Sequence, residues 1–186
     1  MEDGAIIDLY WSRDQRAVEE TAGKYGSFLF SLAWNILKSR SDAEECVNDT
    51  YLRTWNAIPP ARPTALQAWL GRITRNLSLD RWKQSRTKKR GGNEMELLLG
   101  ELDECVPSPH GMEEQLEDRE IAALVSAFLR TLPAENRIVF LRRYWYGQDL
   151  ADIAAERRCS VGKVKSSLFR TRRALRAYLE QEGVLL

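Results

Sequence analysis

Apolar residues recur every three or four positions through both ends of this 186-residue chain, and no segment alternates apolar and polar residues over a useful length. The first pattern is typical of amphipathic α-helices, whereas half-buried strands would need the second. We therefore predict an all-α protein. One such stripe near the start of the chain consists of Phe28, Leu29, Leu32, Ala33, Ile36 and Leu37.

The charged residues divide the chain into three blocks, although the formal net charge is only +1. Residues 1–90 carry a net charge of +4, residues 91–119 carry −8 and residues 120–186 carry +5. The acidic block is broken by glycine and proline clusters that are typical of loops, with at most one short helical turn over residues 97–102. We predict two small helical domains, 1–90 and 120–186, joined by an acidic linker. The two basic blocks suit contact with a polyanion.

Other features of the sequence exclude several classes of protein. The cysteines, Cys46, Cys105 and Cys159, form no CxxC pair for zinc or redox chemistry, so we expect reduced thiols. No apolar run approaches the roughly 20 residues that span a bilayer, and the acidic start lacks the basic-then-apolar order of a signal peptide. We expect a cytoplasmic protein with no membrane insertion, no cofactor and no metal.

The last two predicted helices have the layout of a helix-turn-helix. A short helix around Ile153 and Ala154 precedes Ser160, which can cap a longer helix that ends near Leu179. The residues of the longer helix predicted to pack on the shorter one are Val161, Val164, Leu168 and Leu175.

The rest of this longer helix is basic, with no acidic residue between Val161 and Arg173. Lys163 and Lys165 lie near its N-terminus, where positive charge opposes the helix macrodipole. Phosphates and base edges in a DNA major groove would favour cations there, because the first turns of a recognition helix meet the bases. The alternative is an ordinary basic surface helix. The predicted contacts with duplex DNA are Ser160, Gly162, Lys163, Lys165, Ser166, Arg170 and Arg173.

A second basic site begins on a predicted helix that Thr64 can cap and continues into residues 81–90. The apolar stripe of this helix consists of Leu66, Trp69, Leu70, Ile73 and Leu77. Six of the ten residues 81–90 are basic, and aromatic and amide groups are interleaved with them. This mixture suits melted nucleic acid, because rings stack on bases, amides read their edges and cations hold the backbone. Trp69 is predicted to lie on the apolar stripe, whereas Arg75 and Asn76 are predicted to lie off it. The residues of this basic site are Arg72, Arg75, Asn76, Arg81 and Lys83.

An acidic helix precedes this site. The stretch Ser41-Asp42-Ala43-Glu44 is typical of a capping box and predicts that the helix begins there. Its acidic side chains could bind a metal ion or a protein, and we favour a protein because the chain has a single histidine, His110.

Taken together, these segments resemble the extracytoplasmic-function (ECF) group of bacterial RNA polymerase sigma factors. Residues 25–90 resemble region two of that family, and residues 129–179 resemble region four. The motifs that carry the resemblance are Asp42-Ala43-Glu44-Glu45, the stretch Ala68-Trp69-Leu70-Gly71-Arg72-Ile73-Thr74-Arg75-Asn76-Leu77, Asp152-Ile153-Ala154 and Ser160-Val161-Gly162-Lys163-Val164-Lys165-Ser166.

The resemblance implies a protein without a catalytic site that binds core RNA polymerase and promoter DNA and is often held inactive by an anti-sigma factor. In the family, the helix matching residues 42–55 docks on polymerase, the segment matching 59–90 captures the melted minus-ten element, and the helix from Ser160 reads the minus-thirty-five element as duplex. Engagement of an asymmetric polymerase also favours a monomer. The polymerase contacts that the resemblance implies are Asp42, Glu44, Glu45, Asp49 and Trp55.

Three other functions stay open at this stage. They are a stand-alone helix-turn-helix regulator, a protein-interaction adaptor, and a metal-dependent hydrolase built on Glu44, Glu45, Asp49 and Asp80. One departure from the family also matters, because Arg158 occupies a turn position that often holds glycine and favours positive φ. The N-terminal segment, with Ile6, Ile7, Leu9 and Tyr10, is expected to pack on the first domain.

Overall fold

The computed structural model describes residues 1–86, 94–103, 105–106 and 115–184. These residues are mostly helical and include no strand, which confirms the all-α prediction. The chain divides into two compact units, Met1–Gly91 and Gly92–Leu186. Each unit has its own buried core, so each is described by itself.

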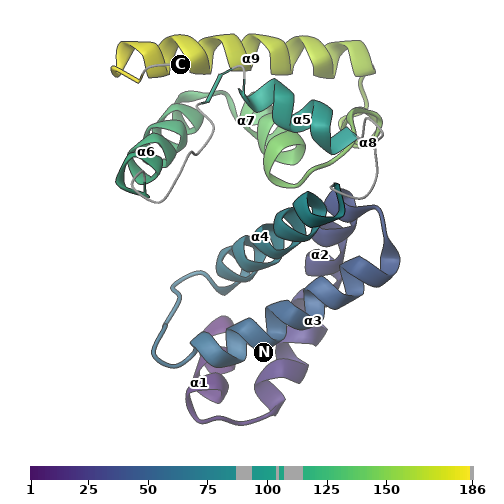
Figure 1. The fold of residues 1–186 in the computed structure, drawn as a ribbon, viewed down its shortest axis with the longest axis vertical. Helices are drawn as coiled ribbons and strands as arrows, with labels where there is room; N and C mark the ends of the chain where they lie inside the picture. Colours follow the sequence, from purple (N-terminus) through teal and green to yellow (C-terminus); the bar gives the residue numbers. More distant parts are fainter. Residues whose placement is uncertain (87–93, 104, 107–114, 185–186) are drawn as a thin grey trace. The chain divides into compact units, whose positions relative to one another are not determined.

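The first unit is a helical bundle (Figure 1). Helices α2 (Arg16–Leu37), α3 (Arg40–Ala57) and α4 (Leu66–Arg86) pack against one another, and α1 (Asp3–Trp11) packs on α2. The N-terminal segment therefore packs on the first domain, as predicted. The core that α1 shares with the other helices includes Ile6, Ile7, Tyr10, Leu29, Leu66 and Leu70.

Helix α3 begins at a different serine from the one predicted. Lys38 ends α2 in the left-handed conformation, with φ 51°, and Ser39 is extended, with its hydroxyl accepting a hydrogen bond from the Asp42 amide at 3.4 Å. Ser39 is thus the cap, and the capping box predicted at Ser41 is wrong. The carboxylate of Glu44 accepts from the Arg40 side chain at 2.9 Å instead of reaching back to Ser41.

Helices α3 and α4 approach each other through small hydroxyl side chains. The Thr50 and Thr74 hydroxyl oxygens lie 2.9 Å apart, and both residues are fully buried. Each hydroxyl also lies near a carbonyl of its own helix, Thr50 2.8 Å from Cys46 and Thr74 3.1 Å from Leu70. One hydroxyl donates to its carbonyl and accepts from the other hydroxyl, because each carries a single proton. These bonds satisfy the buried hydroxyls. Small residues therefore form the contact between α3 and α4. Trp69, also on α4, is half-buried and packs against the core, as predicted.

The second unit contains the remaining helices and begins before the predicted linker ends. Its last helix, α9, packs on α6, α7 and α8, and α5 packs on a π-helical segment, η2. The acidic block thus contributes α5 and the start of α6 to the second unit. The elements are α5 (Glu94–Asp103), α6 (Gln115–Thr131), α7 (Ala134–Phe140), η2 (Leu141–Trp145), α8 (Leu150–Glu156) and α9 (Val161–Gln181).

The turn between α8 and α9 holds the predicted strained residue. Arg158 has a φ of 51°, which confirms that this position requires the left-handed conformation. A non-glycine residue there costs about 1–2 kcal/mol. A glycine would relieve this strain, although its greater freedom in the unfolded chain would cancel part of the gain. We expect Arg158→Gly to stabilise the second unit by about 0.5–1 kcal/mol in thermal denaturation. Arg158→Ala is the control, because it removes the same charge but keeps the strain; equal unfolding temperatures for the two variants would contradict the argument.

Candidate nucleic-acid and polymerase interfaces

Helix α9 is capped as predicted. The Ser160 hydroxyl accepts a hydrogen bond from the Lys163 amide at 3.2 Å, and Ser160 itself is extended. The buried stripe starts one turn into the helix, because Val161 is 38% exposed and its predicted packing is wrong. The buried residues of α9 are Val164, Leu168, Thr171, Leu175 and Leu179.

The other side of α9 presents the predicted DNA contacts to solvent. The exposed residues there are Ser160, Gly162, Lys163, Lys165, Ser166, Phe169, Arg170 and Arg173.

Phe169 belongs to this surface although the sequence analysis did not include it among the contacts. It is 54% exposed, and the Arg173 guanidinium carbon lies 5.9 Å from its ring centroid. The sequence did contain a signal for Phe169, because its aromatic ring lies off the predicted apolar stripe of this helix. Such a ring in a major groove can contact a thymine methyl group.

One polar contact joins α9 to α7 and another joins the end of α8 to α7, beside a small hollow of about 110 Å³ that Lys163 and Arg170 help to line. Ser167 donates to the Asn136 side chain of α7 at 3.2 Å, and Arg157, after α8, pairs with Glu135 of α7 at 2.9 Å. The exposed cations of α9 therefore project from a helix that is tied to α7 by a side-chain hydrogen bond.

The predicted minus-ten residues on α4 differ in exposure. Arg72, Asn76 and Lys83 are exposed, as nucleic-acid contacts need to be. Arg75 is half-buried, and this burial lowers the pKa of its guanidinium, so the prediction that it lies off the packed stripe is wrong. Trp82 is only 5% exposed and packs inward. The cations at 88–90 lie outside the described residues.

Arg81 joins α4 to α3. Its guanidinium lies 2.5 Å from the Glu45 carboxylate and 3.9 Å from the Asp42 carboxylate, and it donates to the Asp42 carbonyl oxygen at 3.3 Å. The hydrogen bond from Arg81 lowers the pKa of Glu45. A residue predicted to bind DNA is thus paired with two residues predicted to bind polymerase.

The outer side of α3 mixes acidic and apolar groups. Glu44 and Glu45 are exposed, Asp42 and Asp49 are half-buried, and Leu52 is 59% exposed on the same helix. Among the residues that the structure describes, no three carboxylate, cysteine or histidine groups lie close enough together to hold a metal.

Trp55, also predicted to contact polymerase, is largely held within the first unit. Its ring packs edge-to-face on Tyr10, with centroids 6.1 Å apart, and the Arg13 guanidinium carbon lies 5.4 Å from the centroid of its ring. Arg13 also donates to the Trp55 carbonyl oxygen at 2.6 Å. Trp55 therefore anchors the end of α3 to the N-terminal helix.

Among the helices that the structure describes, none combines the length and the apolar character that a membrane span needs.

These features define a class: a two-unit helical protein with a helix-turn-helix whose second helix exposes a basic face, as DNA-binding proteins have. Two family models match the chain, Sigma-70 region 2 at residues 22–88 and Sigma-70 region 4 at residues 122–175. Both matched stretches coincide with the helices described above.

Two sigma factors that are similar over most of the chain agree with these matches. The ECF RNA polymerase sigma factor SigL of Mycobacterium tuberculosis is 30% identical over 168 residues, covering 87% of this chain and 88% of SigL. SigE of Mycolicibacterium smegmatis is 28% identical over 182 residues, covering 96% of this chain and 68% of SigE. A solved structure, that of CnrH in complex with the cytosolic domain of CnrY, is similar at 23% identity, with a TM-score of 0.43 over 96% of this chain and 97% of CnrH.

The chain belongs to the ECF RNA polymerase sigma factors. The predicted family is therefore confirmed, and the sigma-factor function is favoured over a stand-alone regulator. A sigma factor binds core RNA polymerase, recognises promoter DNA and helps to melt it at the start of transcription.

Proposed function

We propose that the two units divide promoter recognition between them. The first unit binds core polymerase through α3 and melted minus-ten DNA through α4, and the second reads the minus-thirty-five element as duplex through α9. The observation that carries this proposal is the exposed basic face at the N-terminal end of α9, where cations gain nothing from the helix macrodipole.

Gly162 supports the same assignment for α9. A glycine within a helix costs up to about 1 kcal/mol relative to alanine. Packing does not require it, because an added Cβ would meet only the Ser160 hydroxyl oxygen, at 3.9 Å. Two features of this turn thus oppose helix stability, the glycine and the lysines, and close approach of DNA accounts for both. In the proposal, Lys163, Lys165, Ser166, Arg170 and Arg173 contact bases or phosphates, and Phe169 adds an apolar contact.

In the first unit, the exposed residues Arg72, Asn76 and Lys83 are proposed to contact the melted strand. The acidic side of α3, with Glu44, Glu45, Asp42 and Asp49, is proposed to dock on polymerase. Arg81 then serves as a brace, because its pairing with Glu45 holds α3 and α4 in register.

The proposal assigns no catalytic step to this chain, since its effect arises from binding energy directed at polymerase and DNA. Promoter DNA and polymerase are cytoplasmic in bacteria, so the proposal also implies a cytoplasmic protein. Because the polymerase is asymmetric, the proposal includes a protein that acts as a monomer. Regulation by an anti-sigma factor is part of the proposal as a property of the family.

Reconstitution tests the proposal. The protein is mixed with core RNA polymerase and genomic fragments, and start sites are mapped; we expect defined starts whose use falls when either upstream element is scrambled. No association with core polymerase would contradict the proposal. Tight binding of duplex sites without polymerase would favour a stand-alone regulator.

A further inference from the structure

We propose that Glu101, on helix α5 of the acidic block, is a positioning residue for the helix-turn-helix of the minus-thirty-five-reading unit. The inference rests on the proposed function of α9. It assigns a structural use to a carboxylate from the block that the sequence indicated to be a linker.

Helix α5 is docked by its apolar side. Met95 and Leu98 are 4% and 2% exposed, and Cys105, just after the helix, is 1% exposed. Leu97, by contrast, is 63% exposed. One-sided burial of this kind is typical of a helix that packs on a folded surface rather than of a solvated linker, and that surface is η2 of the second unit.

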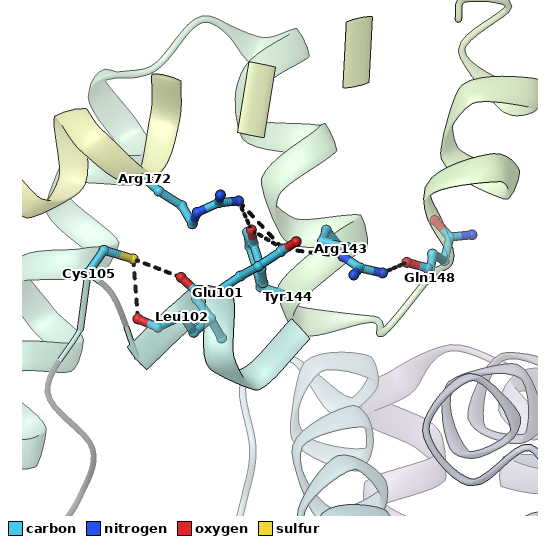
Figure 2. A network of polar contacts seen from close by, with 7 residues as sticks. All are labelled: Glu101, Leu102, Cys105, Arg143, Tyr144, Gln148 and Arg172. Atoms are coloured by element: carbon cyan, nitrogen blue, oxygen red, sulfur yellow. Dashed lines mark hydrogen bonds and ion pairs between the residues drawn. The ribbon is translucent and has the colours of Figure 1, made fainter. Parts of the chain in front are cut away.

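Glu101 lies at the centre of a polar network at this contact (Figure 2). Its Oε2 accepts a hydrogen bond from the Tyr144 hydroxyl at 2.8 Å, and the same oxygen lies 3.5 Å from Arg172 Nη1 and 3.7 Å from Arg143 Nε. Arg172 also donates to the Tyr144 oxygen at 2.6 Å. A single carboxylate oxygen therefore faces one hydroxyl and two guanidiniums.

The charges explain why a carboxylate is needed there. Arg143 is 1% exposed, and a buried cation is costly unless an anion lies beside it. Burial, and then the hydrogen bond with Glu101, raise the pKa of Tyr144, so the hydroxyl stays protonated as the donor. Glu101 thus supplies the negative charge between Arg143 and Arg172.

The network reaches both helices of the helix-turn-helix. Arg143 Nη1 donates to the Gln148 carbonyl at 3.2 Å, and Gln148 immediately precedes Asp149, at the N-terminus of α8. Arg172 lies on α9, half-buried between the exposed Arg170 and Arg173. Glu101 is therefore connected to the start of α8 through one arginine and to the back of α9 through the other.

A second set of contacts strengthens the link to α8. The Gln148 side chain donates to the Glu156 carboxylate at 3.1 Å, and Arg142 of η2 pairs with the same carboxylate. Segment η2 is a π-helix, a strained form that is often found at functional sites. Removing the charge of Glu101 should therefore make the orientation of α9 relative to α8 less fixed. It changes no residue on the exposed face of α9.

The test uses the full chain with core polymerase and a promoter found by reconstitution. Glu101→Gln keeps the shape and removes the charge. Glu120→Gln is the matched control, because it makes the same change at an exposed glutamate of the second unit. The readout is transcription from the native promoter divided by that from a version with a scrambled minus-thirty-five element, at a temperature at which circular dichroism shows full helicity.

For Glu101→Gln we expect this ratio to fall about tenfold and the unfolding temperature of the second unit to fall by about 5–10 °C; Glu120→Gln should change neither. A lowered unfolding temperature with an unchanged ratio would show a merely structural role and overturn the inference. If the wild type shows no dependence on the upstream element, the proposed function itself fails.

Tyr144→Phe provides a second test that changes no charge. It removes the hydroxyl that joins Glu101 to Arg172, so we expect a smaller fall in the same ratio. Should Glu101→Gln fail to fold, the result for Tyr144→Phe decides: an unchanged ratio in a folded Tyr144→Phe protein would overturn the inference.

Discussion

Replacing Lys163 and Lys165 together by glutamine should remove most minus-thirty-five-dependent transcription and leave the protein at least as stable as before. Both side chains are exposed on the first turns of α9. Each contact with a base or phosphate is worth about 1–3 kcal/mol, so we expect roughly a 100-fold loss of promoter use. Removing positive charge near a helix N-terminus should stabilise the helix by a few tenths of a kcal/mol. Transcription assays and thermal denaturation on the same samples measure both effects.

The matched control for this double variant is Ala177→Glu with Gln181→Glu. It lowers the net charge by the same amount, at exposed positions near the other end of α9. Negative charge near a helix C-terminus is unfavourable, so this variant should lose a little stability and keep its promoter use. Equal losses of transcription in the two variants would mean that overall charge, rather than contacts at the N-terminal turns, governs DNA binding.

The sequence was most informative where local chemistry decides the structure. Ser160 caps α9 because a serine precedes an apolar stripe of helical period, and both are visible in the sequence. Arg158 adopts positive φ at the turn where the family resemblance pointed to it. The exposed face of α9 followed from the same periodicity, since residues off the buried stripe must face solvent.

Contacts between distant residues were not predictable in this way. Glu101 bonds to Tyr144 and Arg172, which lie 43 and 71 positions further along the chain. Arg81 reaches back 39 positions to Asp42. Sequence periodicity shows which face of a helix is buried but not which residues of another helix lie opposite. Arg81 was therefore predicted without its partners, and Arg172 was not singled out at all. The prediction of where α3 begins was wrong for a different reason. Ser39 and Ser41 both precede an acidic residue by three positions, so the sequence offers two possible caps. The extended backbone at Ser39 identifies it as the cap.

The acidic block shows how local composition and contacts between distant residues combine. Its net charge of −8 indicated a linker between the two predicted domains. One of its carboxylates, however, neutralises buried arginines in the DNA-reading unit. Composition averages over the roles of single residues, whereas the geometry shows that Glu101 lies between Arg143 and Arg172.

Truncating one buried leucine in each unit should give the largest losses of stability. Leu70 in α4 and Leu175 in α9 are both fully buried. Leucine-to-alanine changes at such sites cost about 2–5 kcal/mol, which corresponds to a fall of at least about 10 °C for units of this size. Because the units have separate cores, we expect Leu70→Ala to lower only the transition of the first unit in calorimetry, and Leu175→Ala only that of the second.

Exposed leucines provide the controls for this last prediction. Leu52→Ala in α3 and Leu97→Ala in α5 remove the same atoms from side chains that are 59% and 63% exposed, so each should change stability by less than about 0.5 kcal/mol. If either buried variant lowers both transitions equally, the two units unfold as one cooperative body. In that case a defect in the minus-ten-binding helices would also disturb the minus-thirty-five-reading helix, and promoter recognition could not be divided between independent units.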